Sequence, residues 1–261
     1  MLFRSTALAA MTFGAYATSI LPGGGSDWLE KLLAAGLVIG LTLIHAGSRR
    51  NSGGLQLIFT ILKVGIIVTF CIFALVLIDT PQAVTFLPVA GDGALLTSGT
   101  FAVALIYVSF AYTGWNAATY LSSELEQPQR TLPWILMGGT SVVTILYVIL
   151  NFVFLYSAPM DAMAGQVEVG YIAAEAAFGE LGGRFTGLVF AMLLVSTVSA
   201  MTLAGPRVIQ VMGEDFPALK RLGKTNKDGI PSTAIFLQSS LSLLFIFSST
   251  FESILVFAGF T

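Results

Sequence analysis

Short polar stretches divide the sequence into apolar runs, most of which are long enough to cross a membrane as a helix. A hydrocarbon core about 30 Å thick is crossed by about 20 helical residues. We predict seven such spans and the beginning of an eighth, at residues 2–21, 29–48, 54–79, 98–121, 132–158, 184–211, 231–249 and 251–261. The fold class is therefore an all-α integral membrane protein, with a single transmembrane transporter domain over residues 1–261.

The composition agrees with a protein that lies mostly within a membrane. Hydrophobic residues make up 56% of the chain and charged residues 10%, against roughly 25% charged residues in soluble domains. We expect a multi-pass protein of the cell membrane that is surrounded by the lipid bilayer. No basic run indicates a nucleic acid partner. With one histidine, one cysteine and no Gly-rich phosphate loop, we expect no enzyme, catalytic residue, metal site or cofactor.

Lysine and arginine are distributed unevenly over the connections between the spans. Short cytoplasmic loops of membrane proteins collect these residues. If the loop at 122–131 is cytoplasmic, nine basic residues lie inside: Arg4, Arg49, Arg50, Arg130, Arg207, Lys220, Arg221, Lys224 and Lys227. Lys31 and Arg184 then lie outside, which supports spans of alternating direction. Helical periodicity at 167–180 predicts a short amphipathic helix on the outer surface.

The span at 98–121 contains a segment that does not suit an uninterrupted membrane helix. Residues 110–116 (FAYTGWN) combine a flexible glycine with hydrogen-bonding groups near the middle of the span. Non-helical backbone at that depth is costly unless it is buried in protein or lines a cavity, and transporters use such broken helices as substrate sites. The alternative is an unbroken span in which Gly114 permits close packing and the aromatic residues face lipid.

Lys63 is a basic residue inside a predicted span. It lies nine residues beyond Gly54, or about 14 Å along a helix at 1.5 Å per residue, so most of its side chain is within hydrocarbon. We expect it to face the interior of the helix bundle. Removal from water favours the neutral form of a lysine, which makes Lys63 a candidate proton carrier. The alternative is a permanently charged lysine bonded to neighbouring hydroxyl groups.

Several motifs together resemble one family of membrane transporters. Residues 110–116, followed by Glu124 and by residues 128–133 (PQRTLP), resemble the sixth helix and following loop of amino acid permeases in the amino acid/polyamine/organocation superfamily. The likeness is greatest to the L-type and related bacterial permeases. Residues 56–63 (QLIFTILK) resemble the start of the fifth helix, and residues 206–231 resemble the loop after the eighth.

The resemblance implies a fold of twelve helices, of which two inverted repeats of five helices form the core. In that 5+5 arrangement, the first and sixth helices are broken side by side at the midplane. This chain would cover about helices 3 to 10. We therefore expect a partial inverted-repeat transporter fold that is truncated at both ends, because residues 251–261 are too few to cross a bilayer.

The resemblance also implies a substrate site at the broken sixth helix. The residues expected to bind substrate lie in one short segment: Phe110, Ala111, Thr113, Gly114, Trp115 and Asn116. Unwinding would release the backbone carbonyls of Phe110, Ala111 and Thr113 to accept hydrogen bonds from a substrate ammonium group. Phe110 would also close over the substrate as an outer gate. Trp115 and Asn116 would shape the pocket for the substrate's side chain.

Lys63 corresponds to the place where sodium-coupled relatives bind sodium, so the resemblance implies sodium-independent transport. Lys63 would act as a proton carrier or a fixed charge. Its expected partners in this coupling site are hydroxyl groups of the eighth helix, on Ser196, Thr197 and Ser199. The alternative is that these hydroxyls bond their own backbone or pack against a neighbouring helix.

The resulting prediction is secondary active transport of a neutral amino acid by alternating access, independent of sodium and coupled to protons. A pocket shaped by Trp115 and Asn116, without a charged residue, suits an uncharged substrate side chain. The alternatives are an obligate amino acid exchanger and a truncated membrane fragment with no transport activity. An ion channel would instead require polar rings along several spans.

Overall fold

The computed structural model of the protein describes residues 2–21, 25–47, 52–115, 125–227 and 229–259. Within these ranges the regular structure is helical, without strands. The elements in chain order are α1 (Leu2–Ser19), α2 (Asp27–Gly47), α3 (Ser52–Leu77), α4 (Asp92–Leu96), α5 (Gly99–Ala111), α6 (Pro128–Ser157), α7 (Met160–Met163), α8 (Val169–Asp215), η2 (Pro217–Leu219), α9 (Ser232–Ser248) and α10 (Phe251–Gly259). The predicted all-α fold class is confirmed, and the assignment to two inverted repeats stays a prediction.

Four of the described helices are long and apolar enough to cross a membrane, namely α2, α3, α6 and α8. Helices α5 and α9 are apolar but shorter. Large apolar side chains on the outer surfaces of these helices are exposed, including Val76 at 73%, Trp134 at 75% and Leu181 at 82%. Lipid accommodates such side chains, so the molecule is a multi-pass membrane protein of the cell membrane.

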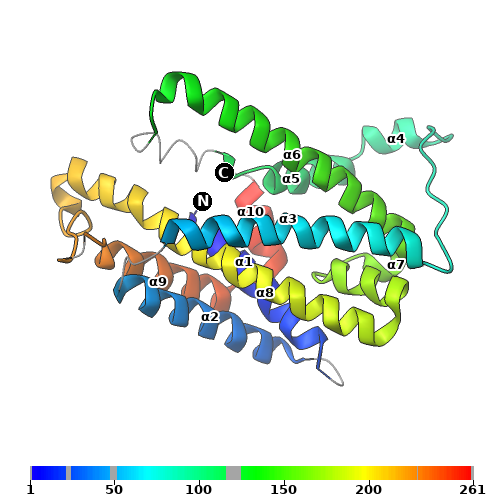
Figure 1. The fold of residues 1–261 in the computed structure, drawn as a ribbon, viewed down its shortest axis with the longest axis horizontal. Helices are drawn as coiled ribbons and strands as arrows, with labels where there is room; N and C mark the ends of the chain where they lie inside the picture. Colours follow the sequence, from blue (N-terminus) through cyan, green and yellow to red (C-terminus); the bar gives the residue numbers. More distant parts are fainter. Residues whose placement is uncertain (1, 22–24, 48–51, 116–124, 228, 260–261) are drawn as a thin grey trace.

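The long helices run roughly along one axis, and their connections gather at its two ends (Figure 1). The C-terminal ends of α2 and α8 and the N-terminal ends of α3, α6 and α9 lie toward the left in this view. The connections that precede α2 and follow α3 and α6 lie toward the right. The loops assigned by their basic residues to the cytoplasm are therefore at one end, and those assigned to the outside are at the other.

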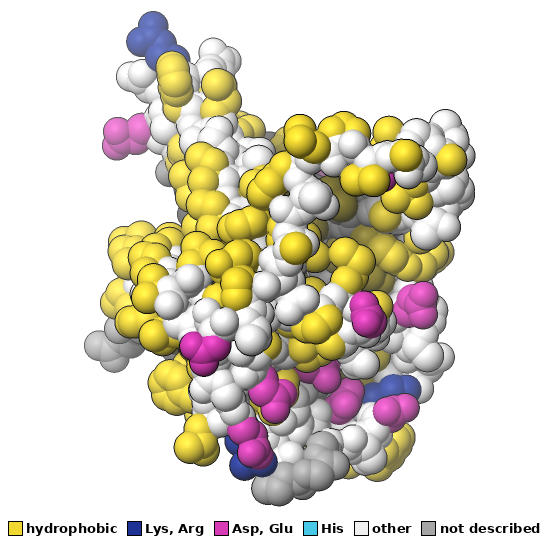
Figure 2. Space-filling view, turned by 90° about the vertical axis from the view of Figure 1, so that its right-hand side faces the viewer, with side chains coloured by type: hydrophobic (Ala, Val, Ile, Leu, Met, Phe, Trp, Pro, Cys, Tyr) yellow, Lys and Arg dark blue, Asp and Glu magenta, His cyan; other side chains and the backbone are white. Residues whose placement is uncertain are grey.

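The right-hand end of the molecule carries many acidic side chains, which Figure 2 shows gathered over its lower half. Asp27, Asp161 and Glu175 are exposed, whereas Glu30 and Glu168 are half-buried. In Figure 2 large hydrophobic areas lie beside and above this acidic region. The mixture is typical of a surface that passes from lipid to water.

The first hydrophobic core joins α1, α2, α8, α9 and α10. Its buried side chains are Ala7, Leu8, Ala10, Ala34, Val38, Val198, Ile246, Ile254 and Ala258. The three alanines on α1 and α2 leave room for the helices to approach closely, which is the usual way in which membrane helices pack. We call this group the first core cluster.

A second core cluster holds α3, α6 and the beginning of α8 together. It consists of Phe70, Cys71, Ala74, Val153, Ala173, Ala174 and Ala177. The ring of Phe70 meets the rings of Phe154, Phe178 and Phe190 edge to face, with centroids 5.4 to 6.1 Å apart. Such aromatic pairs contribute about 0.5–1.5 kcal/mol each beyond their burial.

Helix α8 begins with a segment that folds back at Gly179, where the backbone leaves the helical conformation. A Cβ atom added to Gly183 would lie 2.8 Å from the Cβ of Glu175. Residues 169–178 therefore lie against the turn that follows Gly179. The sequence predicted a separate amphipathic helix over 167–180. Its apolar side supplies the three alanines of the second core cluster.

Candidate functional site

Helix α5 ends inside the predicted span 98–121, at Ala111. The backbone N–H of Tyr112 bonds back to carbonyls of the last helical turn, and the backbone then turns through Gly114 at a φ of 101°. Residues other than glycine rarely adopt this left-handed conformation. The turn therefore depends on the glycine that the sequence places there. Asn116 and the remainder of the predicted span to residue 121 lie outside the described residues.

The carbonyl of Phe110 is occupied in this structure. It accepts the backbone N–H of Thr113 at 3.0 Å and the Thr113 hydroxyl at 2.7 Å. Unwinding was expected to leave this carbonyl available to a ligand, but the chain bonds it locally because a threonine follows three residues later. A ligand ammonium would have to displace Thr113 to reach it.

The side chain of Phe110 is half-buried and packs against the first core cluster. The residues that follow it are more open. Ala111, Thr113 and Gly114 are exposed, and Trp115 is 59% exposed. The structure therefore places Phe110 inward and leaves Trp115 uncovered, so it does not enclose the predicted binding segment as one pocket.

The side chain of Lys63 reaches from α3 to α8. Its Nζ atom donates a hydrogen bond to the Thr197 hydroxyl at 2.9 Å. That hydroxyl donates its own proton to the carbonyl of Leu193 at 3.2 Å. Because the proton of Thr197 is committed to its own helix, the oxygen presents a lone pair to Lys63. Both the charged and the neutral form of the lysine can donate to that lone pair.

Lys63 forms no ion pair within the described part of the chain. A lysine ammonium inside a membrane protein is normally paired with an acid or with several polar groups. A single hydroxyl contact stabilises the charge less than a carboxylate does. The arrangement therefore permits the lysine to release its proton without breaking an ion pair.

The three predicted hydroxyl residues of α8 have three different environments. Thr197 bonds Lys63, whereas the Ser199 hydroxyl lies 2.8 Å from Nε2 of His45 on α2. Ser196 is 3% exposed, and its hydroxyl has no hydrogen-bond partner in the structure as described. Thr197 and Ser199 thus contact different helices, α3 and α2. Lys63 bonds one of the three predicted hydroxyl residues, not all three.

Val198 connects the two parts of the candidate site. It is fully buried in the first core cluster, against which Phe110 packs. Its chain neighbours Thr197 and Ser199 hold Lys63 and His45. A movement of this turn of α8 would therefore displace both the end of α5 and the contact of Lys63, because close-packed interiors transmit displacement.

Sequence reasoning missed a set of polar contacts among α1, α2, α8 and α9. The Gln238 amide is 1% exposed and donates to the carbonyl of Met201 at 3.0 Å. The hydroxyls of Thr42 and Ser239 are 2.6 Å apart. The contact between His45 and Ser199 was likewise not predicted. A lone glutamine within an apolar run was the available signal, since such residues often bond across helices.

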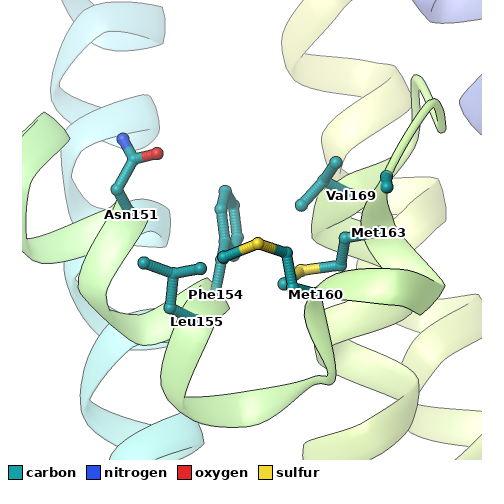
Figure 3. Close-up of a pocket in the computed structure, with 7 residues that line it drawn as sticks. Asn151, Phe154, Leu155, Met160, Met163 and Val169 are labelled. Atoms are coloured by element: carbon teal, nitrogen blue, oxygen red, sulfur yellow. The ribbon is translucent and has the colours of Figure 1, made fainter. Parts of the chain in front are cut away.

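A pocket elsewhere in the molecule contains none of the predicted site residues. It has a volume of about 260 Å³ and is lined by Asn151, Phe154, Leu155, Met160, Met163, Ala164 and Val169. In Figure 3 the apolar side chains converge on it from α6, α7 and the start of α8. No charged side chain lines this pocket. The pocket is therefore mostly apolar, with Asn151 as the polar side chain in its lining.

Comparison with known proteins places the whole chain in one family. The family model described as amino acid permease matches residues 2–260. The mouse b(0,+)-type amino acid transporter 1 is 24% identical over 98% of this chain and 53% of its own length. The branched-chain amino acid permease BcaP of Lactococcus lactis is 24% identical over 91% of this chain and 51% of its own length.

The serine/threonine exchanger SteT of Bacillus subtilis is 27% identical over 87% of this chain and 51% of its own length. This chain therefore spans about half the length of these relatives. The match confirms the resemblance that residues 110–116 and the flanking motifs indicated. Because the family model covers nearly every residue, the chain belongs to the amino acid permease family.

Proposed function

We propose that the protein takes part in secondary active transport of neutral amino acids by alternating access, independently of sodium and with proton coupling. The contact between Lys63 and Thr197, at 2.9 Å, carries the proposal. By the family resemblance, these helices flank the place where sodium-coupled relatives bind sodium. The amino group of Lys63 would take the place of the sodium ion, and unlike sodium it can bind and release a proton.

The environment of Lys63 supports a proton carrier over a fixed charge. Its bonding partner Thr197 accepts from either form of the lysine, and no acid within the described residues pairs with it. Loss of the proton therefore breaks no charged contact. Gain of the proton places an unpaired charge between α3 and α8, which favours a different packing of these helices. Such a difference between two protonation states is what couples a proton to a conformational change.

The substrate would bind at the end of α5. The turn at Gly114 ends the helix, and the helix end leaves backbone groups without their usual helical partners. The carbonyls of Ala111 and Thr113 are the proposed acceptors for the substrate ammonium, with Phe110 as the gate. Trp115 and Asn116 would contact the substrate's side chain, which suits a neutral amino acid because neither residue is charged.

Obligate exchange is the second candidate. The likeness to a serine/threonine exchanger supports it, because the match covers 87% of this chain. In an exchanger Lys63 would remain charged throughout, as a substitute for bound sodium. Uptake would then require an amino acid on the opposite side of the membrane and would not respond to a proton gradient.

Uptake of radiolabelled leucine and serine into proteoliposomes separates the two candidates. A symporter accumulates substrate in empty liposomes when the outside is acidified, and potassium can replace sodium without loss. An exchanger takes up label only into liposomes preloaded with amino acid. Uptake that depends on sodium would contradict the proposal, as would a measurable single-channel current.

Replacing Thr197 with valine tests the contact directly. Valine has nearly the same shape but no hydroxyl, so Lys63 loses its acceptor while the packing of α8 is kept. We expect uptake to fall and its pH dependence to shift, because an unsatisfied buried polar group costs roughly 1–3 kcal/mol. Ser199→Ala is the matched control, since this hydroxyl bonds His45 instead of Lys63. An equal shift in both variants would refute a specific role for Thr197.

A further inference from the structure

The loop that follows α8 forms a basic pocket at the end of the molecule assigned to the cytoplasm. The pocket has a volume of about 450 Å³ and is lined by Gly213, Glu214, Pro217, Lys220, Gly223 and Lys224. Arg221 and Lys227 lie in the same loop, outside the lining. None of the four basic side chains has an ion pair or hydrogen-bonding partner among the described residues. They are exposed charges available to a ligand.

The loop is held in place before any ligand binds. The backbone of Gly223 packs directly on Gly213 of α8, where an added Cβ atom would lie 2.2 Å from the Gly223 nitrogen. Backbone bonds from Leu222 to Leu219, at 2.8 Å, and from Asn226 to Ile230, at 2.8 Å, close the turns on either side. Lys220 and Lys224 are thereby presented from a preformed backbone, which lowers the entropy that binding must offset.

Exposed apolar side chains adjoin this pocket in the sequence. Val211 is 52% exposed, Met212 45% and Phe216 56%. They belong to the last turn of a membrane-spanning helix and the residue that follows it, where lipid headgroups meet acyl chains. A ligand that suits the whole surface therefore has a negatively charged group for the lysines and a hydrocarbon portion for the apolar residues.

We propose that this pocket binds the phosphate of an anionic phospholipid of the cytoplasmic leaflet. Clusters of four or more Lys and Arg residues next to the cytoplasmic end of a spanning helix attract such lipids. Glu214 also lines the pocket, and its carboxylate accepts the amide of Gln210 at 2.9 Å. This carboxylate can accept hydrogen bonds from the hydroxyls of a glycerol headgroup. Phosphatidylglycerol combines all of these features.

The test is native mass spectrometry of the full chain in detergent, which counts bound lipids directly. Three probes at equal concentration separate the possible sources of binding. These are phosphatidylglycerol, phosphatidylcholine with the same acyl chains, and soluble glycerol 3-phosphate. We expect phosphatidylglycerol to bind and the other two to bind weakly. Equal binding of both lipids would overturn the proposal, and tight binding of glycerol 3-phosphate would identify a site for free phosphate instead.

Two double variants with the same change in charge locate the site. Lys220→Gln with Lys224→Gln removes the lysines that line the pocket, and we expect phosphatidylglycerol to bind roughly 30-fold more weakly. This factor corresponds to about 2 kcal/mol at about 1 kcal/mol for each lysine. Arg221→Gln with Lys227→Gln removes two charges from the same loop outside the lining, and we expect a loss several-fold smaller. Equal losses would show diffuse attraction by the loop and refute a pocket.

Folding and transport do not confound this result. All four positions are exposed, so the variants should retain the circular dichroism spectrum and the melting temperature of the parent in phosphatidylcholine. Lys220→Arg with Lys224→Arg keeps the charge and should keep the binding. The measurement requires no transport activity, so it stands or fails independently of the function proposed above.

Discussion

Liposomes containing the Lys63→Met protein are expected to take up amino acid at a rate that no longer responds to external acid. In the parent protein, one proton per substrate would raise the accumulation ratio by up to about tenfold for each unit of inward pH gradient, because one unit is worth about 1.36 kcal/mol. Methionine has a similar length and no titratable group. The variant would therefore lose the whole response, while α3 and α8 stay packed through the rings of Phe70 and Phe190.

The fold should tolerate this substitution. The hydroxyl of Thr197 still donates to Leu193 at 3.2 Å after Lys63 is removed, and a methionine side chain suits an apolar interior. Lys31→Met is the matched control, because Lys31 is a lysine near the start of α2, outside the candidate site. Retention of the acid response by Lys63→Met would exclude Lys63 as the proton carrier. Absence of any acid response in the parent would instead favour exchange.

Gly14→Ala should strongly destabilise the bundle. Helices α1 and α2 approach so closely at this residue that an added Cβ atom would lie 2.4 Å from the carbonyl oxygen of Glu30. The atom in the way belongs to the backbone and cannot rotate aside, so the two helices must separate. Overpacking of this kind costs typically about 1–3 kcal/mol. We expect a lower melting temperature in detergent and a lower yield of folded protein.

Gly36→Ala provides a control within the neighbouring helix. Gly36 lies in α2, and no atom would come within 4 Å of its added Cβ. Alanine at such a position should leave stability unchanged or raise it by up to about 1 kcal/mol, because alanine is the better helix former. If both variants melted at the same temperature, the result would contradict the close approach of α1 and α2 at Gly14.

The helical fold class could be predicted because the membrane imposes it on any chain with these apolar runs. Residues 29–48 and 54–79 were predicted as spans, and α2 and α3 occupy nearly the same positions. The family could also be predicted from the sequence, because residues 110–116 and several flanking motifs together resemble amino acid permeases. Individual contacts were harder to predict. Ser196, Thr197 and Ser199 were all expected to be partners of Lys63, but the sequence does not identify which helix faces each hydroxyl, and Ser199 meets His45 instead.

The local bonding of the break was likewise beyond the sequence pattern. Gly114 marked where the helix could end, and the left-handed φ of 101° agrees with that requirement. Which carbonyls remain available depends on the turn that forms afterwards. Thr113 bonds Phe110 through both its backbone and its hydroxyl, a choice that results from the torsion angles of a single turn.

Sequence alone determined the apolar spans, the presence of an intramembrane lysine and the family of the chain, because each rests on residue type and order. Tertiary structure alone decided that Lys63 meets Thr197 and not Ser196 or Ser199. It also decided that His45 meets Ser199 and that Gln238 bonds α8. The physical reason is that such contacts depend on how neighbouring helices rotate and cross. Rotation and crossing are determined by packing over the whole bundle, which no local pattern in the chain encodes.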